Sequence, residues 1–207
     1  MILEENGITL EAYLDKNTDI ICVFGCLLTE SGKKIKEEML SWILTKYDCI
    51  IVNQEAPGKL FEFPALVMAK KVSIMYNKPV LYLHTKGAAH STNVYNQVNC
   101  RMIWKDEFIN HYDDYYNEVN KDKNIAKVLC PFCSNKHNTT ILNGFIANQL
   151  AWQKVSIPKP VERFRYEHIF DPVKVQMFGR VLNNVNALGK TDPGFKQMLN
   201  YINNFNI

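Results

Sequence analysis

The sequence predicts an α/β fold: a single domain with a mainly parallel mixed sheet flanked by helices. Three observations predict it: short apolar runs that end in polar residues, helical segments between these runs, and short links that join them. The chain of 207 residues shows no internal repeat and no linker long enough to divide it. We therefore expect one domain over residues 1–207, with residues 170–207 as a helical C-terminal extension.

The first half of the chain alternates strand and helix. DIICVFGCLLTE (19–30) predicts a buried strand, and SGKKIKEEMLSWILTKY (31–47) predicts an amphipathic helix with Ser31 as its N-cap. The predicted apolar face of this helix comprises Ile35, Met39, Trp42 and Ile43. DCIIVNQE (48–55) predicts a second strand. A second helix is expected over about 61–76, since proline at position 64 is tolerated in a first turn.

A third strand, 79–83, carries the most informative residues of the chain at its carboxyl end. His84, Thr85 and Lys86 follow it directly, and Gly87 allows the backbone to turn. Ligands bind at this edge of open α/β sheets, so a cationic end rich in hydrogen-bond donors indicates an anionic ligand, phosphate above all. The alternative is an ordinary strand end with a capping histidine and a solvated lysine.

The second half predicts fewer regular elements. Residues 94–119 are expected to be mostly helical, and NIAKVLC (124–130) is expected to form a fourth strand. The segment 141–155 predicts a strand or turn around Asn143-Gly144, followed by a short helix. Residues 159–172 predict a charged and aromatic segment that is helical from Val161, and 173–207 predicts helical pieces.

Composition excludes several classes of protein. The chain is 47% hydrophobic and 12% aromatic, as expected of a folded globular protein. Its net charge of +3 is spread over interleaved acids and bases, so no nucleic-acid-binding patch is indicated. No run approaches the roughly 18 apolar residues of a membrane span. The acidic N-terminus does not resemble a signal peptide, and six cysteines without one indicate reduced thiols, so we expect a cytoplasmic protein.

Three clusters permit both a chemical and a structural interpretation. CPFC (130–133) with His137 suggests zinc or redox chemistry, but it lacks a second ligand pair, so buried thiols are favoured and we expect no metal there. Asp113-Asp114 lacks a partner carboxylate at helical spacing, so a solvated helix face is favoured. Glu167, near Arg163 in RFRYEHIF, is either an ion-pair partner or a general base.

These segments together resemble a group of bacterial and viral proteins classed as glycosyltransferases of the GT-A type. The group's pattern is a Glu-any-Pro helix start, a strand ending in His-Thr-Lys-Gly, an Arg/Trp helix, a Gly-Asn-Phe-Trp-Trp-Ala-like segment and a late Arg…Glu pair. The matching residues here are Glu62 with Pro64, His84 to Gly87, Arg101 with Trp104, Asn143 to Asn148, and Arg163 with Glu167. The order holds from about residue 60 to 170, although Asn143-Gly144 reverses the usual Gly-Asn order and Phe145-Ile146 replaces the aromatic run.

The resemblance implies glycosyl transfer from a nucleotide sugar to a glycan or lipid-linked acceptor. Catalysis is implied for Lys86, on the leaving group, and Glu167, which receives the acceptor proton. Nucleotide-sugar binding is implied for Phe24, Gly25, Asn53, Gln54, Glu62, His84, Thr85, Arg101, Asn143, Gly144, Asn148 and Arg163.

The metal requirement and the activity itself stay open at this point. Many such transferases bind a divalent cation through Asp-any-Asp, where this chain has His-Thr-Lys. We therefore expect no metal ligands, although Mn²⁺ or Mg²⁺ is compatible with the chemistry. Two alternative functions remain: a non-catalytic relative that binds nucleotide or sugar, and another α/β enzyme that acts on a phosphorylated substrate.

Overall fold

The computed structural model describes ten strands and six helices. The described residues are 2–5, 8–13, 20–27, 30–44, 49–56, 62–84, 95–134, 139–140, 144–157, 166 and 168–179. The strands are β1 (Ile2–Glu5), β2 (Ile8–Tyr13), β3 (Ile20–Leu27), β4 (Cys49–Ala56), β5 (Val80–His84), β6 (Val128–Cys130), β7 (Cys133–Ser134), β8 (Thr139–Thr140), β9 (Phe145–Ala147) and β10 (Val175–Met177). The helices are α1 (Glu30–Leu44), α2 (Phe63–Tyr76), α3 (Tyr95–Trp104), the π-helix η2 (Lys105–Asn110), α4 (Tyr112–Asn120) and α5 (Gln149–Lys154).

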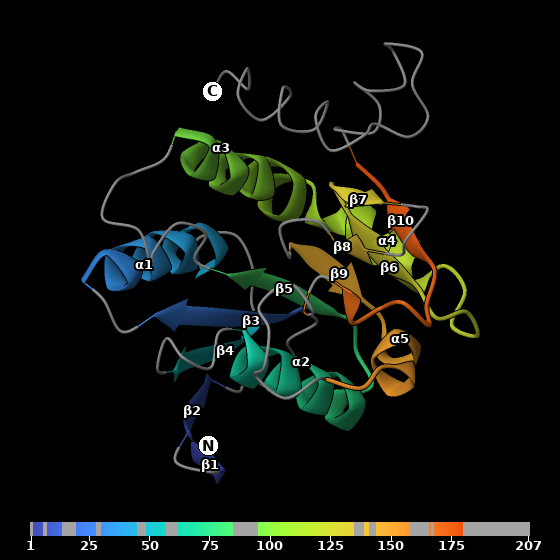
Figure 1. The fold of residues 1–207 in the computed structure, drawn as a ribbon, viewed down its shortest axis with the longest axis horizontal. Helices are drawn as coiled ribbons and strands as arrows, with labels where there is room; N and C mark the ends of the chain where they lie inside the picture. Colours follow the sequence, from blue (N-terminus) through green and yellow to red (C-terminus); the bar gives the residue numbers. More distant parts are fainter. Residues whose placement is uncertain are drawn as a thin grey trace.

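A mixed sheet of eight described strands forms the centre of the molecule, in the order β1-β2-β4-β3-β5-β9-β6-β10 (Figure 1). The three strands predicted first, β3, β4 and β5, pair in parallel. β2 and β9 run antiparallel to both of their neighbours. The predicted mixed α/β sheet with flanking helices is therefore confirmed, but antiparallel pairings at these two strands make it less parallel than we expected.

The order of the first three parallel strands places helices on both faces of the sheet. From β3 the chain moves to β4 on one side and then returns past β3 to β5 on the other side. Crossover connections between parallel strands are right-handed, so opposite directions of winding put α1 and α2 on opposite faces. The alternation of side chains along β5 then divides the core, with Leu81 and Leu83 on the α1 face and Val80 and Tyr82 on the α2 face.

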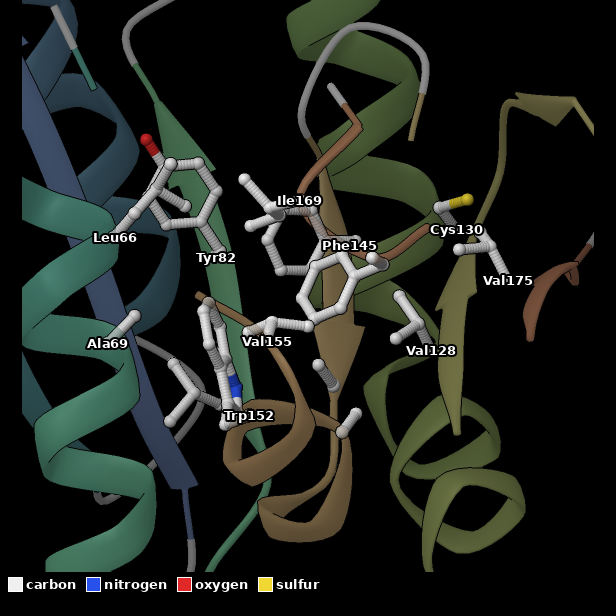
Figure 2. Packing of buried hydrophobic residues seen from close by; sticks show 14 of the residues in the cluster. Leu66, Ala69, Tyr82, Val128, Cys130, Phe145, Trp152, Val155, Ile169 and Val175 are labelled. Atoms are coloured by element: carbon white, nitrogen blue, oxygen red, sulfur yellow. The ribbon is translucent and has the colours of Figure 1, made fainter. Parts of the chain in front are cut away.

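The core on the α2 face is rich in aromatic residues. Tyr82 of β5 stacks on Phe145 of β9, with ring centroids 5.2 Å apart, and Phe145 also contacts Trp152 of α5 and Phe170. Figure 2 shows Leu66 and Ala69 of α2 beside these rings, with Val128 and Val175 on the far side. Aromatic side chains bury large areas, so this cluster joins α2, α5 and the strands β5, β9, β6 and β10 into one unit.

The core on the α1 face is covered by α1, α3, η2 and α4. Ile35, Met39 and Ile43 of α1 are buried as predicted, while Trp42 is half-buried beneath the Lys105 ammonium, 5.0 Å from its ring centre. α1 begins at Glu30, so the prediction of Ser31 as the N-cap is wrong. The predicted helix over 94–119 is confirmed in outline, but it consists of α3, η2 and α4 in succession.

The sheet extends further along the chain than the sequence analysis predicted. Residues 175–177, expected to be helical, form β10, which pairs in parallel with β6. The Tyr115 hydroxyl fixes the end of β10, since it lies 2.7 Å from the Phe178 carbonyl oxygen and 3.0 Å from Oε2 of the buried Glu107. Gly179 follows with φ +97°, and a side chain there would collide with the Tyr115 ring.

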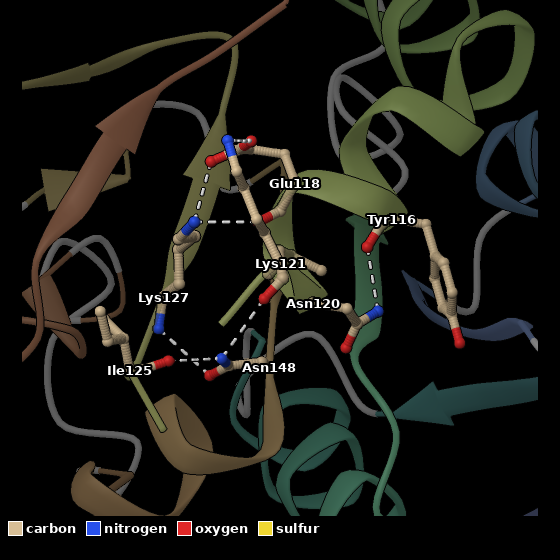
Figure 3. A network of polar contacts seen from close by, with 8 residues as sticks. Tyr116, Glu118, Asn120, Lys121, Ile125, Lys127 and Asn148 are labelled. Atoms are coloured by element: carbon tan, nitrogen blue, oxygen red, sulfur yellow. Dashed lines mark hydrogen bonds and ion pairs between the residues drawn. The ribbon is translucent and has the colours of Figure 1, made fainter. Parts of the chain in front are cut away.

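Asn148 joins the end of β9 to the segment that precedes β6 (Figure 3). Its Oδ1 accepts hydrogen bonds from the backbone N–H groups of Lys127 (3.1 Å) and Ala151 (3.0 Å), and the second of these caps α5. Its Nδ2 donates to the Ile125 carbonyl at 2.7 Å. Lys127 also binds Glu118 at 2.8 Å, and this ion pair lowers the pKa of the Glu118 carboxyl. Asn148 therefore has a structural role.

Within the described residues, no helix is both apolar and long enough to cross a membrane.

We predict that Asn148→Ala lowers the free energy of unfolding by about 2–4 kcal/mol, because an N-cap is lost and buried backbone groups lose their partners. Denaturant titration measures this loss. The matched control is Gln149→Ala at the next position, which we expect to change stability by less than about 0.5 kcal/mol. Equal stability of the two variants would contradict the structural role of Asn148.

Candidate functional site

The carboxyl ends of three parallel strands bring five of the predicted site residues together. Gln54 of β4 is in register with Gly25 of β3, and Gly25 is in register with His84 of β5. One residue earlier along β3, Phe24 is in register with Asn53. Polar strand ends that were separate in the sequence thus form one continuous row across the sheet.

This row lies at the point where the strand order reverses. β4 and β5 flank β3 and are reached by helical connections on opposite faces, so α1, which follows β3, and α2, which follows β4, cover opposite sides of the sheet. Ligands of open α/β sheets bind at the carboxyl edge at such a point. Gly25 of β3 and Gln54 of β4 are the register pair at this point, and His84 lies next to Gly25 on its other side.

Glu62 stands at the N-terminus of α2, beside the same edge. It is the N-cap residue of the helix, and Pro64 follows in the first turn as predicted. The Glu62 side chain forms no capping hydrogen bond to the helix. It is half-buried and acts electrostatically on two tyrosines of the α2 face, Tyr82 and Tyr166.

Tyr82 and Tyr166 form a buried cluster with Glu62. Both rings are 0% exposed. Burial and then the Glu62 carboxylate raise the pKa of Tyr166 to about 12, and the same two causes raise the pKa of Tyr82 well above its usual range. The Tyr166 hydroxyl makes no hydrogen bond in the described part of the chain. Two neutral hydroxyls and a carboxylate suit a ligand that carries hydroxyl groups of its own.

Gly144 and Trp104 are in direct contact. A β-carbon at Gly144 would lie 2.6 Å from Cε2 and 2.9 Å from Cδ1 of the Trp104 indole, which is itself fully buried. β9 is antiparallel to β5, and Phe145 is in register with Tyr82, so Gly144 lies at the same edge as His84. The glycine is required at this edge by the packing of α3 against the start of β9.

Arg101 lies on α3 one helical turn before Trp104. Its side chain is only 4% exposed. Burial lowers the pKa of its guanidinium, and Glu38 of α1 and Cys100 act in the opposite direction. Arg101 therefore belongs to the α1 face of the molecule, whereas Glu62 and Tyr166 lie on the α2 face.

Asn148 is at the other edge of the sheet from this row. Ala147 is in register with Val80, the first residue of β5, so the end of β9 lies at the amino end of the parallel strands. The structure therefore separates Asn148 from Gly144, although both were predicted to bind the nucleotide sugar. The reason is the extended backbone of β9, which carries the segment across the sheet between them.

The remaining predicted site residues lie outside the described residues: Thr85, Lys86, Asn143, Arg163 and Glu167. Tyr166 itself is described, and the Glu62 carboxylate is near enough to act on its hydroxyl. Tyr82 and Tyr166 were not singled out in the sequence. A tyrosine in an apolar strand carries no signal of its own, and only its neighbours in the folded chain show that its hydroxyl is near a carboxylate.

The alternative metal-binding clusters have the following environments. Cys130 and Cys133 are free thiols and are fully buried, and burial together with the neighbouring Cys133 raises the pKa of Cys130 well above its usual range. His137 lies outside the described residues. Asp113 and Asp114 are exposed on α4. Across the described ranges, no three His, Cys, Asp or Glu side chains gather closely enough to hold a metal ion.

No family model matches the chain, and no curated protein or solved structure is similar to it at a significant level.

We predict that Gly144→Ala lowers the free energy of unfolding by about 1–3 kcal/mol, because the added methyl group overpacks the site against Trp104. The double variant Gly144→Ala with Trp104→Phe should show a smaller additional loss than Gly144→Ala alone, since the smaller ring leaves space. Thermal and denaturant unfolding of the four proteins in this cycle measure the coupling. Strictly additive losses would contradict the contact as the reason for the glycine.

Proposed function

We propose that the chain transfers a glycosyl group from a nucleotide-sugar donor to a glycan or lipid-linked acceptor. The observation that carries the proposal is the row Gln54–Gly25–His84 at the strand-order reversal, with Glu62 and Tyr166 beside it. A nucleotide fits such a crevice in α/β sheets, and the hydroxyl-rich cluster suits a sugar. The resemblance of the flanking segments to GT-A glycosyltransferases supports the same assignment.

The proposed reaction assigns one task to each part of the edge. Phe24, Gly25, Asn53 and Gln54 hold the nucleotide. An acceptor hydroxyl attacks the anomeric carbon of the donor sugar, and the bond from that carbon to the diphosphate oxygen breaks. His84 and Lys86 stabilise the negative charge that builds up on the departing diphosphate. Glu167 takes the proton of the attacking hydroxyl.

Two structural findings modify the roles that the resemblance implies. Asn148 has no part in the proposal, because its polar atoms bind the backbone at the opposite edge. Arg101 acts through the packing of α3, since its side chain is buried on the α1 face. No metal is assigned a step, and Mn²⁺ or Mg²⁺, which stays compatible with the chemistry, enters as a variable of the experiments.

We predict that a nucleoside diphosphate protects the backbone amides of Asn53 and His84 from hydrogen exchange, and that Lys86→Ala weakens this effect. Loss of a hydrogen bond to a charged group costs about 1.5–3 kcal/mol, which is roughly a ten- to hundredfold loss of affinity or turnover. Lys86→Arg should restore activity only in part, because its planar fork differs from an ammonium group.

The measurement is made with chelator present and repeated with Mn²⁺. Protection confined to residues 173–207 would overturn the location of the site. Activity that chelator alone abolishes would overturn the metal-free mechanism, and wild-type turnover in Lys86→Ala would overturn the role of the lysine.

A second prediction concerns Tyr166. Tyr166→Phe removes a buried hydroxyl that has no partner within the described chain, so stability should stay constant or rise by about 1 kcal/mol. If the hydroxyl serves the bound sugar, donor or acceptor affinity falls about two- to tenfold. Tyr115→Phe is the matched control, because it breaks two hydrogen bonds on the α1 face of the core, opposite to the face of Tyr166, and should lower stability with no effect on the affinity of the folded protein. Unchanged affinity in Tyr166→Phe would exclude the sugar contact.

A further inference from the structure

A cavity of about 390 Å³ lies at the amino end of the parallel strands, at the edge opposite to the row that contains His84. It is formed where the C-terminal ends of α2 and α4 meet the start of α5. Its lining includes Asn77, Lys78, Tyr116, Lys123, Asn148 and Gln149. We call it the amino-edge cavity. Its volume is in the range of small-molecule sites, which is about 300–1,000 Å³.

The walls of the amino-edge cavity are held in place by bonds within the protein. The Asn148 side chain bonds four backbone groups, those of Val119, Ile125, Lys127 and Ala151, and these bonds fix the segment that carries Lys123 (Figure 3). The Asn120 amide donates to the Tyr116 carbonyl at 2.9 Å on the adjoining wall. Asn77 ends α2 in the left-handed conformation, φ 52°, which turns the chain into Pro79 and β5. The cavity is thus preformed, which lowers the entropic cost of binding.

Three polar side chains of the lining form no polar contact with the rest of the described chain. No hydrogen bond or ion pair within the described chain engages the Lys123 ammonium, the Gln149 amide or the Asn77 amide. Amide groups can both donate and accept, so they suit ligand hydroxyls. Pro79, Leu150 and the ring of Tyr116 supply the apolar part of the lining.

The charge of the lining is positive. Lys78 and Lys123 line the cavity, and none of the described residues that line it is acidic. Of the acids near Lys123 along the chain, Asp122 accepts a hydrogen bond from the Asn124 backbone N–H at 2.9 Å, and Glu118 is paired with Lys127 at 2.8 Å and with Lys121 at 3.8 Å. A phosphate monoester carries a charge of about −1.5 to −2 at pH 7, which matches two lysines better than the single charge of a carboxylate does.

We propose that the amino-edge cavity binds a small hydroxylated ligand that carries a phosphate group, such as a sugar phosphate. The lysines bind the phosphate, the Gln149 and Asn77 amides bind hydroxyl groups, and the apolar wall packs against the carbon skeleton. This site is separate from the carboxyl edge, and the proposal does not depend on the proposed glycosyl transfer.

Three probes separate the contributions to binding: inorganic phosphate, glucose and glucose 6-phosphate, each titrated into the full chain by calorimetry and by NMR of the backbone amides. We expect saturable binding of glucose 6-phosphate, with shifts at Asn77, Lys123 and Gln149. Inorganic phosphate should bind more weakly, and glucose more weakly still. Affinity should fall as salt rises, because the lysines are near solvent.

Matched variants locate the site. Lys123→Ala and Gln149→Ala should each weaken glucose 6-phosphate binding about two- to tenfold, the range for single polar contacts near the surface. Lys121→Ala is the control, because Lys121 lies on the same segment and is exposed like Lys123, but it is near Glu118 and does not line the cavity. It should leave the affinity unchanged. Tyr166→Phe, at the opposite edge, should also leave it unchanged.

Four outcomes would overturn the proposal. They are no saturable binding of glucose 6-phosphate at millimolar concentration, shifts confined to Asn53 and His84, equal weakening by Lys121→Ala and Lys123→Ala, and equal affinity for inorganic phosphate and glucose 6-phosphate. The second outcome would assign the phosphate to the carboxyl edge, and the third would reduce the effect to unspecific attraction by surface charge. The fourth would remove the role of the amides.

Discussion

The position of β3 between β4 and β5 is the constraint on which the rest of the molecule depends. β4 and β5 pair with it in parallel on its two sides, so the right-handed crossovers that reach them put α1 and α2 on opposite faces. This divides the core into the clusters that α1 and α2 cover, and ligands of open α/β sheets bind at the carboxyl edge of such a point. The predicted binding residues from three separate strands come together at that edge for the same reason.

β9 is the second constraint, because it is antiparallel and only three residues long. Its first residue is in register with Tyr82 and its last with Val80, so its two ends face opposite edges of the sheet. Gly144, which precedes β9, is in contact with Trp104. The side chain of Asn148, which follows β9, forms hydrogen bonds with backbone groups of α5 and of the segment before β6. A motif that is contiguous in sequence therefore contributes to two separate places in the fold.

The sequence predicts the elements that have a clear period or a clear end. The first three parallel strands, the buried face of α1 and the position of Pro64 follow from apolar runs, helical spacing and the chemistry of proline. The hairpin of β1 and β2 was not predicted, although Asn6-Gly7 between two β-prone runs is a strong signal for a two-residue turn. β9 and β10 are too short to show a period, so only pairing with their neighbours defines them.

The sequence predicts residues of the candidate site only where the order of strands and helices along the chain fixes their position in the fold. The ends of parallel strands converge by topology, so the sequence alone is enough to group Gly25, Gln54 and His84. Tyr166 and Glu62 are about a hundred residues apart, and nothing local couples a tyrosine to a distant carboxylate. The reverse holds for Asn148, because a side chain able to bind a sugar is equally able to cap a helix. An asparagine in a motif therefore indicates a ligand only when its side-chain amide forms no hydrogen bonds with the backbone around it.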